Sequence, residues 1–410
     1  MIKLMSRHPH PIRVSYATTI YGAAEKRAVM KVLSNPGRIV AGHAVAEFEK
    51  KVAAMFGKKR GIMVNSGSSA NLVSLSILDL AEGSEVITPA LTFSTTLAPI
   101  LQRRLMPVFV DVEEGTYVVD VDQVEAKVTK RTKALMIPSL IGNIPDLSAL
   151  QRIAKKHKLH LIEDSCDTLG PAFKGKPTGT YTDISTTSFY ASHIITAAGG
   201  GGMLCLNDPA LAERARVMAY WGRQSTLFGA YEKSEEIKKR FAGKLDGEPY
   251  DAKFIFSEVG YNFQPTEIQG AFGLEQLKHF KAFKARRQKN FASLLKFFSH
   301  YQDRFILPHS LSGVDTAWLA FPLTVRPNAG FSRFELAKYL EERDIQTRPI
   351  FTGNVTKQPG FRDVLKNFSG RFPMTDAVMR GGLLIGCHHG ITEKHLEYLQ
   401  YVFREFLNKH

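Results

Sequence analysis

The stretch Asn65-Ser66-Gly67-Ser68-Ser69-Ala70-Asn71 separates an apolar run, residues 61–64, from a helical pattern. Small residues at the start of a helix let backbone N–H groups close around a phosphate dianion. An ordinary Ser/Gly helix cap has the same composition, and for this segment alone the cap is the simpler interpretation. The predicted strand, the turn at residues 65–71 and the helix that follows begin an α/β pattern that continues along the chain.

Short β-rich runs alternate with helical ones through the first half of the chain. The helical patterns include residues 146–157 and 209–220. This alternation predicts an α/β fold with a mostly parallel sheet, whose functional loops leave the carboxyl ends of the strands. The predicted strands are residues 61–64, 85–88, 107–112, 134–137, 159–162, 185–190 and 203–206.

The pattern changes near residue 265, where a long helical stretch begins and runs to residue 298, interrupted by Gly270 and Gly273. We interpret this stretch as a spine between domains. The sequence thus predicts a large domain, residues 1–264, and a spine with a small C-terminal α/β domain, residues 265–410. The small domain is predicted to hold strands 318–325 and 345–350, a helix opened by a Ser332/Glu335 capping box, and a closing helix 392–407.

Composition narrows the class of protein. The chain has 410 residues, 44% of them hydrophobic, and a net charge of +15, so it can bury a large core and attract an anion. No zinc-finger spacing or RNA-binding signature accompanies the charge, which therefore favours a small anionic substrate over nucleic acid. No run is apolar enough for a signal peptide or membrane helix, and three scattered cysteines make no disulfide framework. These features predict a cytoplasmic protein with no membrane partner.

Two further stretches carry groups that suit a flat, charged ligand. An apolar strand ends in Leu161-Ile162-Glu163-Asp164, and a carboxylate there can keep a pyridine nitrogen protonated. Phe93 follows another strand in Thr88-Pro89-Ala90-Leu91-Thr92-Phe93 and can stack on a heterocycle. Separately, Asp164 is as easily a helix cap and Phe93 a core residue.

A fourth stretch, Ser188-Phe189-Tyr190-Ala191-Ser192-His193, precedes the glycine run from Gly199 to Gly202. In order and approximate spacing, the four stretches resemble the sugar aminotransferases of the DegT/DnrJ/EryC1/StrS family. The resemblance implies the pyridoxal phosphate-dependent transferase fold of the aspartate aminotransferase type (fold type I). It also implies a cofactor site made of Gly67, Ser68, Phe93, Asp164, Asp167, Ser188, Tyr190 and Asn262.

The family's cofactor-binding lysine is replaced here by His193. Imidazole forms no stable Schiff base, so the cofactor must be held noncovalently and His193 is predicted to act as a base. This replacement resembles the family's 3-dehydratase branch, which uses pyridoxamine phosphate to remove the C3 hydroxyl of a nucleotide-linked 4-keto-6-deoxyhexose. The resemblance suggests glutamate as the amino donor that recharges the cofactor. Two alternatives stay open: an aminotransferase variant, and a catalytically silent scaffold or sensor.

Within the dehydratase branch, one subtype carries an iron–sulfur cluster on cysteines that follow a Trp-Gly-Arg segment. Here Trp221-Gly222-Arg223 is followed by no cysteine before Cys387, so neither a cluster nor any other metal site is predicted. The resemblance further implies a homodimer with shared sites, in which Asn262 reaches the neighbouring chain's phosphate. Arg223, Arg348 and Lys357 are candidates for neutralising a diphosphate, although solvated surface charge explains each of them equally well.

Overall fold

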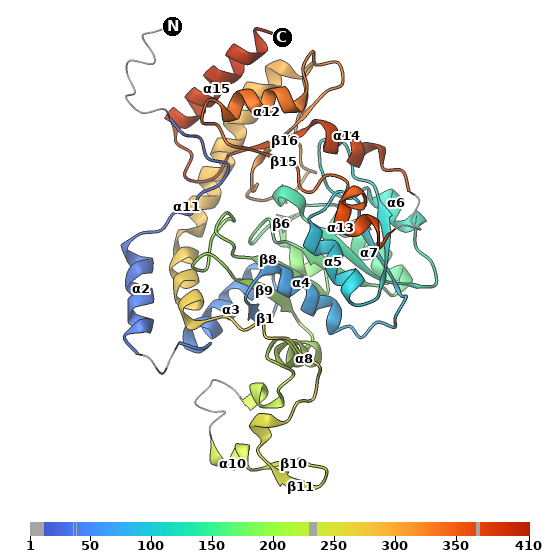
Figure 1. Cartoon of the computed structure of the whole chain (residues 1–410), viewed down its shortest axis with the longest axis vertical. Helices are drawn as coiled ribbons and strands as arrows, with labels where there is room; N and C mark the ends of the chain where they lie inside the picture. Colours follow the sequence, from blue (N-terminus) through green and yellow to red (C-terminus); the bar gives the residue numbers. More distant parts are fainter. Residues whose placement is uncertain (1–11, 36, 38, 229–235, 366–369) are drawn as a thin grey trace.

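A seven-stranded sheet forms the centre of the large domain in the computed structural model, which describes residues 12–35, 37, 39–228, 236–365 and 370–410. The strand order is β1-β9-β8-β5-β4-β2-β3 (Figure 1). Only β9 runs antiparallel to its neighbours, so the predicted mostly parallel sheet is confirmed. The strands are β1 (Arg60–Val64), β2 (Glu85–Pro89), β3 (Met106–Val110), β4 (Thr132–Pro138), β5 (His160–Asp164), β8 (Ile184–Ser188) and β9 (Gly202–Leu206).

Helices connect and cover these strands. Aspartate side chains begin several of them: Asp146 accepts a hydrogen bond from Ala149 N at the start of α7, and Asp208 accepts one from Leu211 N at the start of α8. None of the helices in the described residues is long and apolar enough to cross a membrane. The helices of this half are α2 (Ala23–Leu33), α3 (His43–Met55), α4 (Gly67–Ser76), α5 (Ser94–Gln102), α6 (Val121–Ala126), α7 (Leu147–His157) and α8 (Pro209–Ala219).

The long helix α11 (Glu267–Phe298) runs without a break, so the predicted interruption at Gly270 and Gly273 was wrong. A Cβ on Gly270 would lie 2.5 Å from the backbone nitrogen of Val45, and one on Gly273 would lie 2.7 Å from the ring of Phe48. The two glycines therefore allow α3 to pack directly against α11. Their role is close helix packing, which the sequence pattern does not distinguish from a helix break.

A second sheet lies at the C-terminal end of α11, in the order β12-β14-β16-β15, with all pairs antiparallel. The capping box of Ser332 and Glu335 opens α12 as predicted. The central strand β16 was not predicted, because its short apolar run begins at a glycine, has a glycine on either side and gives no periodicity. The elements here are β12 (Phe305–Ile306), β14 (Phe321–Val325), α12 (Arg333–Glu341), β15 (Thr347–Pro349), α13 (Pro359–Arg362), α14 (Pro373–Gly381), β16 (Gly382–Ile385) and α15 (Glu393–Leu407). The domain boundary at residue 264 stays a prediction.

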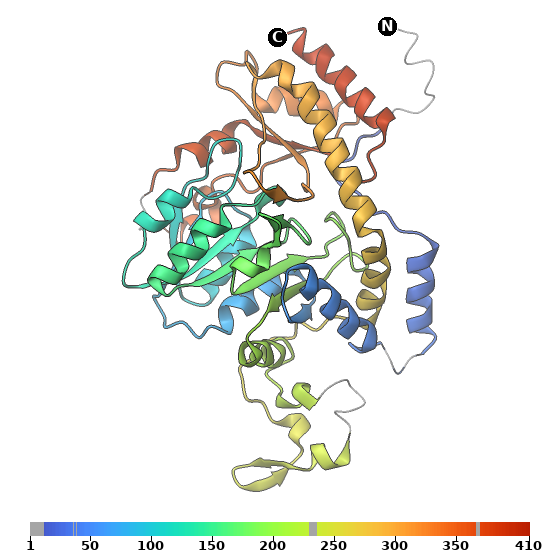
Figure 2. The ribbon, with the colours of Figure 1, turned by 180° about the vertical axis from the view of Figure 1, so that it is seen from behind.

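Two small features were not predicted at all. A three-stranded sheet joins β6 (Ala172–Phe173) and β7 (Lys176–Pro177) to β13 (Val314–Asp315). A lobe carrying α10 (Ile237–Arg240) and the hairpin of β10 (Gly243–Leu245) and β11 (Glu248–Tyr250) projects away from the body of the molecule in both views (Figures 1 and 2).

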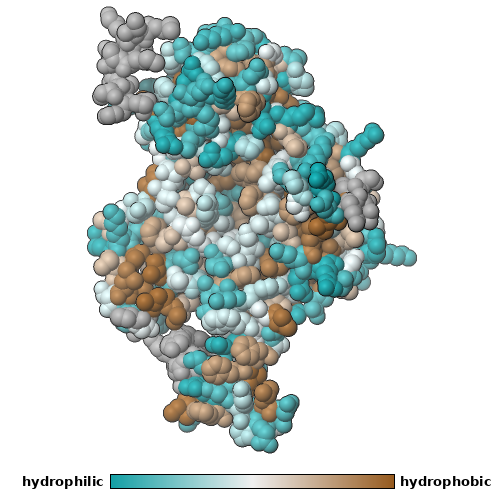
Figure 3. All heavy atoms as spheres, in the orientation of Figure 1, coloured by the Kyte–Doolittle hydropathy of each residue, from teal (hydrophilic) through white to brown (hydrophobic). Residues whose placement is uncertain are grey.

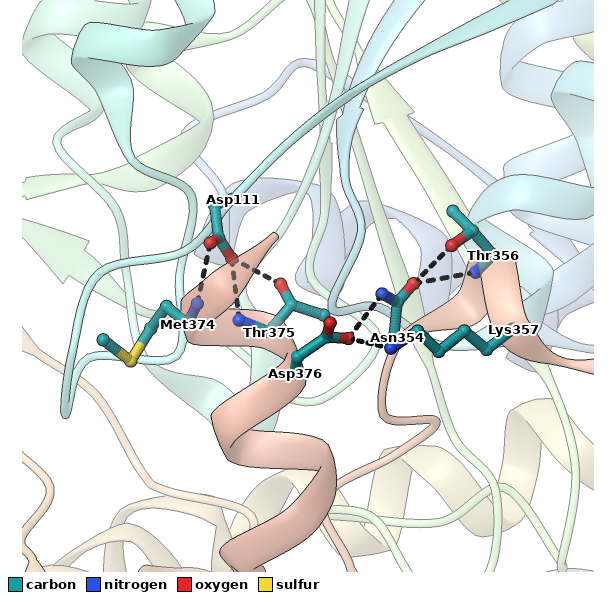
Figure 4. Close-up of polar contacts among 7 residues, drawn as sticks. All are labelled: Asp111, Asn354, Thr356, Lys357, Met374, Thr375 and Asp376. Carbon is teal, nitrogen blue, oxygen red and sulfur yellow. Dashed lines mark hydrogen bonds and ion pairs between the residues drawn. The ribbon is translucent and has the colours of Figure 1, made fainter. Parts of the chain in front are cut away.

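A buried carboxylate fastens the large sheet to the small domain. Asp111 follows β3 and accepts hydrogen bonds from Met374 N, at 2.8 Å, and from Thr375 N and Oγ1, at 2.8 and 2.6 Å, at the start of α14 (Figure 4). In the same view, Asp376 of this helix accepts a hydrogen bond from Asn354 Nδ2 and forms an ion pair with Lys357. Asp111 thus caps a helix that belongs to the other domain.

We expect Asp111→Ala to lower the free energy of unfolding by about 2 to 3 kcal/mol, because it leaves buried N–H groups of α14 without an acceptor. The measurement is the thermal midpoint, read by circular dichroism. Asp208→Ala, which removes the exposed cap of α8, is the matched control and should cost about 1 kcal/mol. Equal losses for the two variants would contradict a special role for the cap between domains.

Candidate functional site

A cavity of about 510 Å³ lies between the carboxyl ends of the large sheet and the small domain. Residues from the small domain and from the N-terminal segment, including Tyr16, Arg348 and Phe351, form part of its wall. Eight of the nine predicted site residues line this one cavity: Gly67, Ser68, Phe93, Asp164, Asp167, Ser188, Tyr190 and His193.

The predicted phosphate-binding stretch, residues 65–71 (the phosphate segment), leads into helix α4. Ser66 is its N-cap and accepts a hydrogen bond from Ser69 N, while Gly67 is the first helical residue. A Cβ on Gly67 would lie 2.6 Å from Cys166 Sγ and 2.7 Å from Ser188 Cβ, so only glycine lets these two segments approach the turn. Gly67 and Ser68, at the start of α4, line the cavity. Backbone N–H groups at a helix N-terminus are suited to bind a phosphate.

Asp164 is fixed by three donors at the end of β5. Its Oδ2 accepts hydrogen bonds from Asn71 Nδ2, at 2.8 Å, and Thr96 Oγ1, at 2.7 Å, and its Oδ1 accepts one from Cys166 N. The carboxylate is thus held rigidly in the cavity wall, where a protonated ring nitrogen finds a counter-charge. Asn71 and Thr96 were not predicted as site residues. Asn71 stands in the phosphate segment, but nothing in the sequence linked it to Asp164.

Asp167 has a different environment from Asp164. Its Oδ2 accepts a hydrogen bond of 2.7 Å from Ile141 N, and Ile141 has a left-handed backbone with φ of 57°. Burial, with a further contribution from the charge of Asp164, raises the pKa of Asp167 to about 7, against the backbone hydrogen bond. Asp167 therefore holds a strained turn of the cavity wall. Its cofactor-binding role stays a prediction.

His193 lies on the loop that joins β8 to β9 and lines the cavity. Its Nδ1 atom is buried and has no hydrogen-bond partner among the described residues. Burial lowers the pKa of His193 to about 4; hydrogen bonding to the backbone of Ser188 opposes the shift, and the charge of Arg287 adds to it. The imidazole is therefore neutral at pH 7 and able to accept a proton.

Two exposed aromatic side chains line the cavity. Phe93 is 46% exposed and meets Phe351 edge to face, with ring centroids 5.9 Å apart. Tyr190 is 59% exposed and lies edge-on to His193, at 6.0 Å. Both rings have free faces on which a flat heterocycle can stack.

Asn262 is the one predicted site residue that does not line this cavity. It is exposed and pairs through its backbone with Tyr220, at the end of α8. A single chain thus leaves Asn262 apart from the other site residues.

The three candidate cations for a diphosphate are in three different settings. Arg348 lines the cavity beside Phe351. Lys357 is paired with Asp376 at 2.7 Å, and Arg223 lies over the ring of Trp221 in a separate cavity of about 440 Å³. Of the three, Arg348 is the cation placed to meet a ligand beside His193.

The donor set fits pyridoxal or pyridoxamine phosphate: a helix N-terminus for phosphate, Asp164 for the ring nitrogen and aromatic faces for the ring. The model of the DegT/DnrJ/EryC1/StrS aminotransferase family matches residues 20–404. The chain belongs to this family. It is 38% identical over 382 residues to a dTDP-4-dehydro-2,6-dideoxy-D-glucose 3-dehydratase of Saccharopolyspora spinosa, covering 91% of this chain and 82% of the relative.

Two other comparisons agree. The lipopolysaccharide biosynthesis protein RfbH of Salmonella typhimurium is 38% identical over 397 residues, which are 94% of this chain and 90% of the relative. The structure of E. coli GDP-4-keto-6-deoxy-D-mannose-3-dehydratase with bound hydrated PLP superposes with a TM-score of 0.84 at 29% identity, covering 96% of this chain and all of that one. The predicted fold type and the resemblance to the dehydratase branch are confirmed.

A glycine of β9 sets the width of the phosphate turn. A Cβ on Gly202 would lie 2.2 Å from the carbonyl carbon of Ser66 and 2.4 Å from Gly67 N. We expect Gly202→Ala to displace the start of α4, to weaken pyridoxal phosphate binding at least about tenfold and to cost about 1 to 3 kcal/mol of stability. Fluorescence titration with pyridoxal phosphate measures the affinity.

Gly360→Ala is the matched control, because a Cβ at Gly360 has no neighbour within 4 Å. It should leave both the affinity and the thermal midpoint near those of the wild type. Unchanged cofactor affinity in Gly202→Ala would mean that the start of α4 does not bind the phosphate.

Proposed function

We propose that this protein is a cytoplasmic, pyridoxamine phosphate-dependent dehydratase that removes the C3 hydroxyl of a nucleoside diphosphate-linked 4-keto-6-deoxyhexose. The observation that carries the proposal is His193, which stands in the cavity in place of a Schiff-base lysine with a neutral ring and an unpartnered Nδ1. Two relatives are named as 3-dehydratases of a dTDP-linked and a GDP-linked sugar, which supports a sugar nucleotide as the substrate.

When bound, pyridoxamine phosphate supplies an amine for the 4-keto group and a protonated ring that stabilises negative charge. Asp164 holds the ring nitrogen protonated, because its carboxylate is fixed by Asn71 and Thr96 at the end of β5. The start of α4 holds the phosphate. His193 would be placed to take a proton from the cofactor's C4′ carbon and to pass it to the departing C3 hydroxyl, which would leave as water.

The electron balance requires an amino donor. Removing oxygen from C3 is a two-electron reduction of the sugar, and the conversion of glutamate to 2-oxoglutarate and ammonia supplies two electrons. Arg348, the cavity cation, is placed to bind an anionic group of glutamate or of the sugar nucleotide. The product is then a 4-keto-3,6-dideoxy sugar nucleotide.

The aminotransferase alternative is disfavoured by the cavity wall. No lysine of the described residues lines the cavity, so no side chain there can hold the cofactor covalently and return a proton as an aminotransferase lysine does. The silent-scaffold alternative predicts no turnover with any 4-keto sugar nucleotide.

We propose that two chains assemble so that Asn262 of each approaches the partner's phosphate site. Its separation from the other site residues within one chain supports this proposal. So do the exposed apolar side chains of α2, which include Met30 and Leu33 with exposed fractions of 59% and 44%. Figure 3 shows a brown, hydrophobic cluster at the left of the molecule, where Figure 1 draws α2.

We expect the reaction to proceed without an iron–sulfur cluster. Cys205 and Cys387 are buried in separate hydrophobic cores, Cys166 lines the cavity, and the described residues contain no group of three His, Cys, Asp or Glu arranged to hold a metal. Protein purified without oxygen should contain less than about 0.1 iron per chain and turn over without a reductase. Stoichiometric iron that is needed for turnover would overturn this expectation.

We expect His193→Asn to bind pyridoxamine phosphate with near wild-type affinity but to lose dehydration by at least about 100-fold, because the base is gone while the phosphate and ring contacts remain. The measurement is product analysis with glutamate and a panel of 4-keto-6-deoxy sugar nucleotides. His193→Lys should restore covalent attachment, detected by borohydride trapping.

His157→Asn is the matched control, since His157 lies on α7 outside the cavity, and it should keep full activity. If His193→Asn still expels the C3 hydroxyl at near wild-type rate, another group is the base. If wild-type protein binds the cofactor but converts none of the sugars, the silent scaffold replaces the dehydratase.

A further inference from the structure

Arg287, in the middle of α11, is completely buried but has no carboxylate partner among the described residues. Its Nη1 donates hydrogen bonds to Trp318 O, at 3.1 Å, and Leu319 O, at 2.9 Å, and its Nη2 donates one of 3.3 Å to His193 O. Nε donates to Nδ1 of His389, at 3.3 Å. A buried cation without a counter-ion is costly, so its retention calls for a reason beyond packing.

The four acceptors come from segments far apart in the chain. Trp318 and Leu319 lead into β14, His389 follows β16, and His193 belongs to the loop between β8 and β9.

The ring of His389 is stacked on Phe283, with centroids 3.8 Å apart. Burial, helped by the charge of Arg287, lowers the pKa of His389 to about 3, so this imidazole is neutral and its Nδ1 can accept. One planar guanidinium thus joins the spine, the small domain and the His193 loop.

The contact with His193 is made through the main chain. Arg287 does not line the cavity, and its hydrogen bond to the carbonyl of His193 leaves the imidazole free. The amide of His193 is fixed from the other side, because it donates to Tyr190 O at 3.0 Å. A loop held at both the amide and the carbonyl of one residue has little freedom to turn that residue's side chain.

The same cation also acts on the imidazole electrostatically. The positive charge of Arg287 lowers the pKa of His193, in addition to the larger effect of burial. The other ionisable groups that line the cavity around His193 are Tyr16 from the N-terminal segment, Asp164 at the end of β5, Cys166 and Asp167 just after that strand, Tyr190 from its own loop and Arg348 from β15.

We propose that Arg287 is a positioning residue for the base, holding the carbonyl of His193 so that the imidazole stays directed into the cavity. This inference rests on the proposed role of His193 and adds a residue that never touches substrate or cofactor. Displacing a reacting group by about 1 Å costs on the order of 100-fold in rate, so an anchor of this kind has a measurable effect.

The test compares Arg287→Met and Arg287→Lys with Asn290→Leu. Asn290 is the matched control, because it lies one turn further along α11, is also fully buried, and donates hydrogen bonds to Cys387 O, His388 O and Ile391 O without contacting His193. All three variants should lower the thermal midpoint. Only the Arg287 variants should reduce kcat, by at least about tenfold, with the affinity for pyridoxamine phosphate changed less than about threefold.

A second readout is independent of turnover. Nitrogen NMR of labelled histidine, with the His193 signal assigned by its loss in His193→Asn, reports the protonation of His193 directly. In the wild type the ring should stay neutral to about pH 5, and in Arg287→Met its titration should move toward the ordinary value of about 6.5. Arg287→Lys keeps the charge, so it should keep the low titration while losing rate.

The outcomes separate this inference from the proposed function. If Arg287→Met matches Asn290→Leu in kcat and leaves the His193 titration unchanged, Arg287 is structural and the inference fails. Should Arg287→Met not fold, the kcat of Arg287→Lys decides, since a wild-type value would refute the need for a guanidinium. If His193→Asn is fully active, the proposed base fails whatever the Arg287 variants do.

Discussion

The close approach of Gly202 to Ser66 is the constraint on which the site depends. At this point β9 passes so close to the turn that begins α4 that a Cβ on Gly202 would clash with the backbone of Ser66, and Gly201 N donates to Asn65 O at 3.0 Å. Gly201 O in turn accepts a hydrogen bond from Phe189 N, at 2.9 Å, in the His193 loop. The turn that begins α4 and the His193 loop are therefore both tied to the glycines at the start of β9.

The electrostatics of the site follow from what is buried around this point. Asp164 accepts hydrogen bonds from Asn71 and Thr96, whereas Asp167 and His193 are buried with few partners and their pKa values shift toward the neutral forms. The cavity wall thus offers one carboxyl group held by donors and one neutral base. This pairing suits a cofactor ring that must stay protonated next to a group that must accept a proton.

The sequence predicted the elements whose signal is local. The strands of the large sheet, the capping box at Ser332 and the site residues from Gly67 to His193 follow from short patterns and the family resemblance. Residues whose role depends on distant contacts were missed. Arg287 looks like any arginine on an exposed helix face, and Gly270 looks like a helix break, because the chain segments that surround them lie far away in the sequence. The predicted role of Asn262 depends on contacts with a second chain.

Replacing the lysine at one loop position changes the chemistry without changing the fold, because most of the predicted cofactor contacts do not involve that loop. The start of α4, Asp164 and Phe93 lie on other elements than the His193 loop. A lysine there requires enough room and freedom to form and break a covalent bond, whereas a base requires only a fixed direction and a neutral ring. The hydrogen bonds to the amide and the carbonyl of His193 fit the second requirement better than the first. The loop is thus restrained in the way that proton transfer demands, and the same fold accommodates a different reaction.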